Sequence, residues 1–280
     1  MSPSTAAPAT PGPAGPGATT PMVEVRGLTQ RFATAGGTVT ALDGVDLAVE
    51  RGRFVSLIGP SGCGKSTLLR VVADLITPTS GQVLVGGRSA AAARREQDYG
   101  IAFQSAGLLE WRTVARNVEL PLELHGVGRR ERRARALELL QLVGLGDVAG
   151  ARPSQLSGGM QQRVAIARAL AESPPLLLMD EPFGALDEMT RERLQDELLG
   201  IAAAAGTTVL FVTHSIPEAV YLSDRVVVMS ARPGRIAAVV DVDLPRGTGT
   251  DVREAPEFFA RVTDVREALR GAPVRAGASA

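Results

Sequence analysis

A glycine-rich segment in the first quarter of the chain limits the possible folds more than any other feature. Residues 59–67 read Gly-Pro-Ser-Gly-Cys-Gly-Lys-Ser-Thr and fit the phosphate-binding pattern G-x-x-x-x-G-K-[ST] at every fixed position. Lys65 is the only lysine among 280 residues, and every other basic side chain is an arginine. A compact ammonium on a flexible stem suits contact with the β- and γ-phosphates of a nucleotide, which the wider guanidinium fork does not.

The sequence around this loop predicts a strand, a turn and a helix. Residues 54–58 form a short apolar run, and apolar residues then recur at helical spacing from Leu68 to Ile76. The loop would therefore lie at a helix N-terminus, where free N–H groups and the helix dipole favour phosphate. The alternative is a glycine-rich turn without a ligand. We expect the following residues to surround the phosphates: Gly59, Pro60, Ser61, Gly62, Cys63, Gly64, Lys65, Ser66 and Thr67.

Composition sets the outer limits. Thirty basic and thirty acidic residues give a formal net charge of zero, so no overall field attracts nucleic acid or anionic lipid. The single cysteine, Cys63, cannot form a disulfide within the chain, in keeping with a reducing compartment. Residues 1–21 are a Pro/Ala/Gly-rich leader that we expect to be disordered, without the basic and apolar parts of a secretion signal.

A second apolar run, 176–179, ends in Asp180 and Glu181. Such a run predicts a buried parallel strand, whose carboxyl end is the edge where open α/β sheets bind ligands. We expect Asp180 to hold Mg²⁺ through water, Ser66 to bind the same ion, and Glu181 to orient or deprotonate the attacking water. The alternative is an acidic pair that opens a helix, because Pro182 follows.

The segment 156–163, Leu-Ser-Gly-Gly-Met-Gln-Gln-Arg, decides between classes of nucleotide enzyme. Together with the loop and the carboxylates in this order it resembles the signature of ABC-type ATPases, over roughly residues 22–240. Met160 departs from the glutamine that many members carry. A GTPase is excluded, because its Asn-Lys-x-Asp element needs a second lysine. Ser157, Gly158 and Gly159 would open a helix and form a second anion site.

The resemblance implies a fold, a partner and further site residues. The fold is α/β: a P-loop NTPase core with a RecA-like mixed sheet, an antiparallel β subdomain and an inserted α-helical subdomain. In a head-to-tail homodimer, the phosphate loop of one subunit and the Ser157 helix of the other would bind one ATP. The other implied positions are Gln104 at Mg²⁺ and water, His214 at the γ-phosphate, Phe32 stacked on adenine and Asp187 at the dimer interface. The alternatives are an exposed glutamine, a core histidine and a core phenylalanine.

The chain divides into a leader at 1–21, an ATP-binding domain at 22–250 with a helical subdomain at about 105–171, and a C-terminal helix and tail at 251–280. Within the helical part, the arginine-rich run 129–135 is best explained as a solvated helix face, since apolar residues follow at helical spacing. Trp111 lies where the family docks a helix of its membrane subunit, although a lone tryptophan is also often core.

The segments 108–114, 117–124 and 230–236 resemble those of importers of nitrate, sulfonates and taurine, with Glu110 a departure from an expected proline. The implied protein is the ATPase subunit of an importer at the cytoplasmic face of the membrane. Its partners would be permease subunits and, indirectly, a solute-binding protein, without nucleic acid. Two alternatives remain. A soluble ABC ATPase of DNA repair or translation predicts a coiled coil, a zinc insertion or tandem cassettes, and a small-molecule kinase needs an acceptor site.

Overall fold

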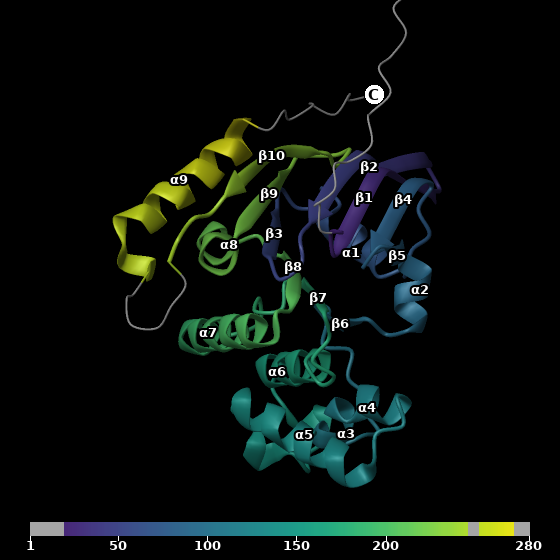
Figure 1. Cartoon of the computed structure of the whole chain (residues 1–280), viewed down its shortest axis with the longest axis vertical. Coiled ribbons are helices and arrows are strands. Elements are labelled where there is room, and N and C mark those ends of the chain that lie inside the picture. The colour runs from purple at the N-terminus through teal and green to yellow at the C-terminus, as the bar shows by residue number, and fades with distance from the viewer. Residues whose placement is uncertain (1–19, 246–251, 272–280) are drawn as a thin grey trace, which may run out of the picture.

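Two sheets organise residues 20–245 and 252–271, the part of the chain that the computed structural model describes. In that part, the larger sheet has six strands in the order β10-β9-β3-β8-β7-β6 (Figure 1). All neighbours in it are parallel except β10 and β9. Its strands are β3 (Phe54–Ile58), β6 (Tyr99–Ala102), β7 (Leu176–Asp180), β8 (Thr208–Val212), β9 (Arg225–Met229) and β10 (Ile236–Asp241).

The smaller sheet is antiparallel, with the order β2-β1-β4-β5 among the described residues. Its strands are β1 (Val23–Thr34), β2 (Gly37–Val49), β4 (Ser80–Val85) and β5 (Arg88–Ser89). In β2, residues 44–49 alternate between exposed and buried, as a sheet with one solvated face requires. By contrast, β3, β7 and β8 are buried at every position and occupy the centre of the larger sheet.

The helices fall into groups that cover different parts of the larger sheet. α1 (Lys65–Val72) packs between the two sheets, where Leu68, Leu69 and Val72 join one apolar core. The inserted helices gather at the end of the molecule away from the smaller sheet (Figure 1). They are α3 (Val114–Val118), α4 (Leu120–Leu124), α5 (Arg129–Leu142) and α6 (Gly158–Ala169). The remaining helices are α2 (Ala90–Arg95), α7 (Glu188–Ala205), α8 (Ile216–Leu222) and α9 (Pro256–Gly271).

Two further cores hold the helices to the sheet. The inserted helices share one with β7 and β8, to which Leu139, Leu140 and Val164 contribute. α8 and α9 share another with β9, formed by Val220, Phe258 and other apolar residues, so that α9 lies along the β10 edge (Figure 1). The predicted α/β fold with a mixed central sheet, an antiparallel sheet and inserted helices is confirmed.

Some local predictions change. The helix after the phosphate loop was expected to extend to Ile76, but α1 ends at Val72 because Asp74 has a φ of 51°, which a helix cannot continue. Leu75 is half exposed as a result. The expected disordered leader falls on residues 1–19, outside the described residues, apart from its last two positions. Among the described residues, no helix is both long and apolar enough to cross a bilayer.

Candidate functional site

The phosphate loop, residues 59–67, joins the carboxyl end of β3 to the first turn of α1. Gly64 is the N-cap of α1, with a φ of 101° and no side-chain hydrogen bond to cap the helix. A Cβ at Gly64 would lie 2.7 Å from Cδ2 of Leu42, so only glycine fits both the backbone angle and the space. The first-turn N–H groups of α1 are therefore not capped by a side chain and can bind an anion.

Lys65 places its ammonium over this loop. The side chain is largely buried, and its Nζ donates to the carbonyl oxygens of Gly59 at 2.7 Å and Pro60 at 3.1 Å. These two carbonyls hold the only lysine of the chain inside the curve of the loop. The predicted phosphate-binding residues are thus brought together by one continuous turn, as the sequence pattern required.

Ser66 and Asp180 bring the loop to the second strand of the site. Ser66 Oγ donates to Asp180 Oδ1 at 2.8 Å, which joins α1 to the end of β7. Burial raises the pKa of Asp180, and the hydrogen bond from Ser66 partly opposes that rise. A hydroxyl and a carboxylate at this distance are oxygen donors of the kind that Mg²⁺ prefers. Among the described residues, no three His, Cys, Asp or Glu side chains gather in a group that could hold a metal ion.

Glu181 follows directly and meets two side chains from neighbouring strands. Nδ1 of His214 lies 3.1 Å from Glu181 Oε2, and Nε2 of Gln104 donates to the same oxygen at 3.5 Å. The three residues follow β7, β8 and β6, which are adjacent and parallel, so the carboxyl ends of these strands converge. Gln104 and His214 are exposed and the Glu181 side chain is partly exposed, so this carboxylate is accessible to solvent beside the phosphate loop. The alternative of a core histidine at His214 does not apply.

The signature segment opens α6 as predicted, but its first turn is not entirely free. Ser157 is the N-cap, and its Oγ accepts a hydrogen bond from the N–H of Met160 at 3.3 Å. The Met160 N–H is therefore not free to bind an anion, contrary to what the sequence had suggested for the first turn of this helix. Gly158 is exposed, and a Cβ on Gly159 would lie 3.1 Å from the carbonyl oxygen of Ala185. The signature therefore packs on the segment 183–187 that follows Glu181.

Asp187 closes that segment with a local role. Its Oδ1 accepts from the N–H of Thr190 at 3.0 Å and caps α7, and this backbone hydrogen bond is the main reason why the pKa of Asp187 is lowered. The side chain is exposed. Phe32, on β1 opposite Val39, is half-buried, and Leu42 of the same β2 strand lies against the phosphate loop.

Hydrogen bonds connect the signature helix to the residues around Gln104. Gln162, buried in α6, donates to the carbonyl of Phe103 at 2.8 Å. Arg168, one helical turn and a half further on, donates to the carbonyls of Ala106 at 2.8 Å and Gly107 at 2.9 Å. Segments on both sides of Gln104 are therefore fastened to α6, which the sequence reading did not foresee.

The sequence reading also missed the segment 230–236, which packs on the outside of the phosphate loop. Arg232 Nε donates to the carbonyl of Gly62 at 2.8 Å, and a Cβ on Gly234 would lie 1.9 Å from the carbonyl oxygen of Cys63. Arg235 forms an ion pair with Asp43 of β2. The only sequence signal was the segment Ser-Ala-Arg-Pro-Gly-Arg-Ile itself, which had been interpreted as a marker of substrate class.

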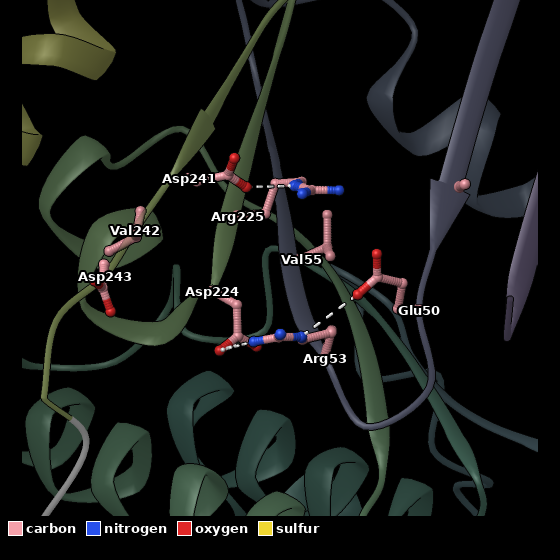
Figure 2. A pocket seen from close by; sticks show the side chains of 9 residues that line it. Glu50, Arg53, Val55, Asp224, Arg225, Asp241, Val242 and Asp243 are labelled. Atoms are coloured by element: carbon pink, nitrogen blue, oxygen red, sulfur yellow. Dashed lines mark hydrogen bonds and ion pairs between the residues drawn. The ribbon is translucent and has the colours of Figure 1, made fainter. Parts of the chain in front are cut away.

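Other hollows lie away from these residues. Figure 2 shows a cavity of about 290 Å³ at the amino ends of β3 and β9, the opposite end of the sheet from the phosphate loop. Its arginines are paired: Arg53 with Glu50 at 3.6 Å and with Asp224 at 3.5 Å, and Arg225 with Asp241 at 2.7 Å. Trp111, 73% exposed, borders another hollow on the inserted helices, so the alternative of a core tryptophan is wrong.

This arrangement defines a class of protein. A glycine-rich loop at a helix N-terminus, a partly buried Ser–Asp pair and a partly exposed glutamate at the carboxyl ends of parallel strands are the parts of a P-loop nucleotide hydrolase. A second helix N-terminus, with the exposed Gly158, accompanies them.

Comparison with known proteins agrees. Residues 42–184 match the family model described as ABC transporter. The taurine import ATP-binding protein TauB of Rhizobium johnstonii is 48% identical over 243 residues, covering 85% of this chain and 90% of that protein. The nitrate import ATP-binding protein NrtD of Synechocystis is 43% identical over 255 residues, covering 89% and 95%. A dimeric ATP-binding cassette solved in a post-hydrolysis state with ADP and Pi superposes with a TM-score of 0.73 at 36% identity, covering 81% of this chain and 100% of that one.

The chain belongs to the ABC transporter family. It is an ATP-binding ATPase of that family, and the resemblance stated from the sequence is confirmed.

Proposed function

We propose that this chain is the ATPase subunit of an importer for a small solute such as nitrate, a sulfonate or taurine. The observation that carries the proposal is the position of Glu181 between Gln104 and His214, beside the Lys65 loop. The substrate class rests on the relatives named for taurine and nitrate import, and their names as import ATP-binding proteins support a permease partner. The solute-binding protein is part of the same proposal.

The residues divide the work of hydrolysis among them. The N–H groups of the phosphate loop and the Lys65 ammonium bind the β- and γ-phosphates, and Phe32 stacks on the adenine. Ser66, Gln104 and Asp180 would hold Mg²⁺, which neutralises charge on the phosphates when bound. Glu181 accepts a proton from the attacking water, and His214 orients that carboxylate and contacts the γ-phosphate.

The second half of the ATP site comes from a second copy of the chain. The first turn of α6, with the exposed Ser157 and Gly158 and the half-buried Gly159, binds the γ-phosphate held by the partner's loop. Asp187 lies at the interface between the copies. ATP then closes the dimer and hydrolysis reopens it. The dimeric cassette that superposes on this chain supports the arrangement.

The proposal also divides the chain into domains. These are an ATP-binding domain at 22–250, with a helical subdomain at about 105–171, and a C-terminal helix and tail at 251–280. The helical subdomain would dock the permease at the membrane's cytoplasmic face. An apolar hollow of about 270 Å³ beside Phe103, Leu120 and Leu124, next to Gln104, supports docking here, as does the exposed Trp111.

The first test measures ATP binding and ATP turnover by the purified chain, with and without Mg²⁺. We expect Lys65→Ala to weaken ATP binding by at least about tenfold, because a charge-assisted contact to the phosphates is lost. Lys65→Arg is the matched control for charge, and it should also fail because the wider fork does not fit the loop. Wild-type ATP affinity in Lys65→Ala would refute the phosphate site.

Capture from membranes tests transport separately. The tagged Glu181→Gln protein is isolated with Mg-ATP from gently solubilised membranes of its host, and its partners are identified by mass spectrometry. Recovery of a multi-span membrane protein is the expected result. Recovery of ribosomal or DNA-bound partners alone would leave the ATPase standing and reject the importer.

A further inference from the structure

Glu218 is a buried carboxylate four residues after His214, and the mechanism above does not use it. Only 8% of the residue is exposed. Its two oxygens accept hydrogen bonds from different elements: Oε1 from Nε2 of Gln195 on α7 at 3.0 Å, and Oε2 from the hydroxyl of Thr213 at the end of β8. Burial raises the pKa of Glu218, and these two hydrogen bonds oppose that rise. A carboxylate buried in this way is retained only where its partners are fixed.

The hydrogen bonds of Glu218 hold both neighbours of His214. In an ordinary capping box the glutamate at the third helical position accepts directly from the N–H of the N-cap residue. Here the N-cap is Ser215, whose N–H donates to the hydroxyl oxygen of Thr213 at 3.0 Å, and Thr213 donates onward to Glu218. Ser215 Oγ in turn accepts from the N–H of Glu218 at 3.4 Å.

The Thr213 hydroxyl thus links the N–H of Ser215 to the Glu218 carboxylate, and residues 213 and 215 are both connected to that carboxylate. His214 lies between them in the chain. The backbone of His214 is consequently fixed on both sides. Its exposed ring is left to extend toward the nucleotide site, with Nδ1 3.1 Å from Glu181. A catalytic ring that is itself exposed depends for its position on such a support.

The same network reaches the C-terminal segment. The amide of Gln195 donates to Glu218 and accepts, through Oε1, from Nη2 of Arg253 at 3.2 Å. The Arg253 guanidinium lies 3.5 Å above the ring of Tyr221, which is on α8 with Glu218, and also contacts Asp196 at 3.2 Å. Because both ends of the Gln195 amide are engaged, its orientation depends on Arg253.

We propose that Glu218 is a positioning residue for His214, and that Arg253 stabilises it through Gln195, so that the C-terminal segment Val252–Gly271 controls the rate of ATP hydrolysis. The inference rests on the proposed function, because it needs His214 to act at the γ-phosphate. It adds an input from the C-terminal segment, whose helix α9 packs on α8 and β9.

The first experiment compares Thr213→Val with Thr213→Ser in the full chain. Valine keeps the shape of threonine but removes the hydroxyl, whereas serine keeps the hydroxyl. We expect Thr213→Val to lower kcat by about tenfold or more, as for a displaced catalytic group, with KM for ATP unchanged within about twofold. Thr213→Ser should restore kcat to within about twofold of wild type.

A double-mutant cycle shows whether the effect passes through His214. In a His214→Ala background, Thr213→Val should cause no further loss of kcat, since there is no ring left to position. An equal further loss would mean that Thr213 acts independently and would overturn the inference. If Thr213→Val does not bind ATP, Glu218→Gln decides instead, because its amide keeps the size of the side chain but can no longer accept from both donors. Wild-type kcat in Glu218→Gln would also overturn the inference.

Two arginine variants test the contribution of the C-terminal segment to the rate of hydrolysis. Arg253→Ala should lower kcat by about threefold with KM unchanged, since one support of Gln195 is lost. Arg261→Ala is the control, because Arg261 lies on α9 and pairs only with the neighbouring exposed Asp264 among the described ion pairs. Equal kcat in Arg253→Ala and wild type would remove the C-terminal segment from the proposal.

The outcomes separate this inference from the proposed function. If His214→Ala lowers turnover and Thr213→Val does not, the positioning role fails and the proposed function stands. If His214→Ala turns over at the wild-type rate, the role of His214 fails and the inference fails with it.

Discussion

At the scale of single residues, the proposed hydrolysis depends on where Glu181 lies. Its oxygen meets Gln104 and His214, which hold it at the edge of the site, and its backbone has a φ of 48°, which few residues other than glycine adopt. Such a conformation persists only where the surroundings impose it. Here the N–H of Glu181 donates to Val212 of the adjacent strand at 2.9 Å, which fixes the turn.

Glu181→Gln tests the carboxylate as a base. The amide keeps the size and the hydrogen bonds but cannot accept the proton of water, so we expect kcat to fall by at least about 100-fold, the usual contribution of a general base. ATP affinity should be unchanged, and the protein should accumulate as a dimer with Mg-ATP by size exclusion with light scattering. Turnover at the wild-type rate would show that another group deprotonates the water.

Asp180 carries a cost in stability that its function explains. Because burial raises its pKa, the carboxyl binds its proton more tightly in the folded protein than in the unfolded chain. The stabilisation from this bound proton is full below the unfolded pKa and is lost as pH rises through the folded pKa. At neutral pH the charged form is therefore destabilising.

Asp180→Asn should consequently be more stable than wild type at pH 7, while its Mg²⁺-dependent ATP turnover falls by at least about 100-fold. The asparagine oxygen can still accept from Ser66. The measurement is urea unfolding without nucleotide and with a chelator, at pH 7 and near pH 4. We expect the difference in free energy of unfolding between the variant and wild type to narrow as the pH falls toward 4 and the aspartate binds its proton. A variant less stable than wild type at pH 7 would contradict the argument.

At the scale of elements, the sequence predicted those parts whose physics is local. The apolar runs 54–58 and 176–179 and the glycine pattern at 59–67 each specify a conformation from a few neighbouring residues, and the structure has them where expected. The convergence of Gln104, Glu181 and His214 could be expected only by resemblance. Residues 77 and 33 positions apart meet because β6, β7 and β8 are adjacent, and sheet order depends on pairings that no local pattern specifies.

The segment 230–236 shows the same limit. Its contact with the phosphate loop spans 170 residues between Arg232 and Gly62, and it depends on β9 lying beside β3. Nothing in the seven residues indicates what they touch. The need for glycine at position 234 is visible only in the structure, where the Cys63 carbonyl occupies the space of a side chain.

Gly234→Ala should therefore displace the phosphate loop. A methyl group 1.9 Å from the Cys63 oxygen forces one of the two segments to move. We expect ATP binding to weaken by about tenfold or more, since misplacement by about 1 Å has effects of that size. Gly200→Ala is the control: Gly200 lies in α7 with no heavy atom near the added methyl, and alanine there should stabilise the helix by about 1 kcal/mol. Unchanged ATP affinity in Gly234→Ala would show that the loop tolerates the shift.

At the scale of the whole molecule, the proposed dimer requires each chain to supply two half-sites, one to each ATP. Lys65 lies at the carboxyl end of β3, whereas Ser157 opens α6 in the inserted helices. Both helix starts are exposed or open to an anion, and no hydrogen bond or ion pair between side chains of residues 59–67 and 157–159 is found among the described residues. Two copies placed head to tail, related by a twofold axis, would complete both sites.

Mixing two inactive variants tests this geometry. Lys65→Ala removes the phosphate contact, and Ser157→Arg places a bulky side chain at the exposed start of α6. Each homodimer is defective at both sites. A mixed dimer combines both defects at one site and leaves the other with a normal Lys65 and a normal Ser157.

Half of the dimers in an equal mixture are mixed, and each has one intact site of two. If the sites act independently, ATP turnover should recover to about a quarter of the wild-type rate, although neither variant alone turns over. The control is a double variant, Lys65→Ala with Ser157→Arg, mixed with wild type. Its mixed dimers have no intact site, so turnover should fall with the fraction of wild-type homodimers.

Failure of the first mixture to recover, with mixed dimers verified by native mass spectrometry, would mean that each ATP is held within one chain or that both sites must be intact together. ATP titration of the mixture separates these two readings, since only the second leaves one tight ATP per mixed dimer without turnover.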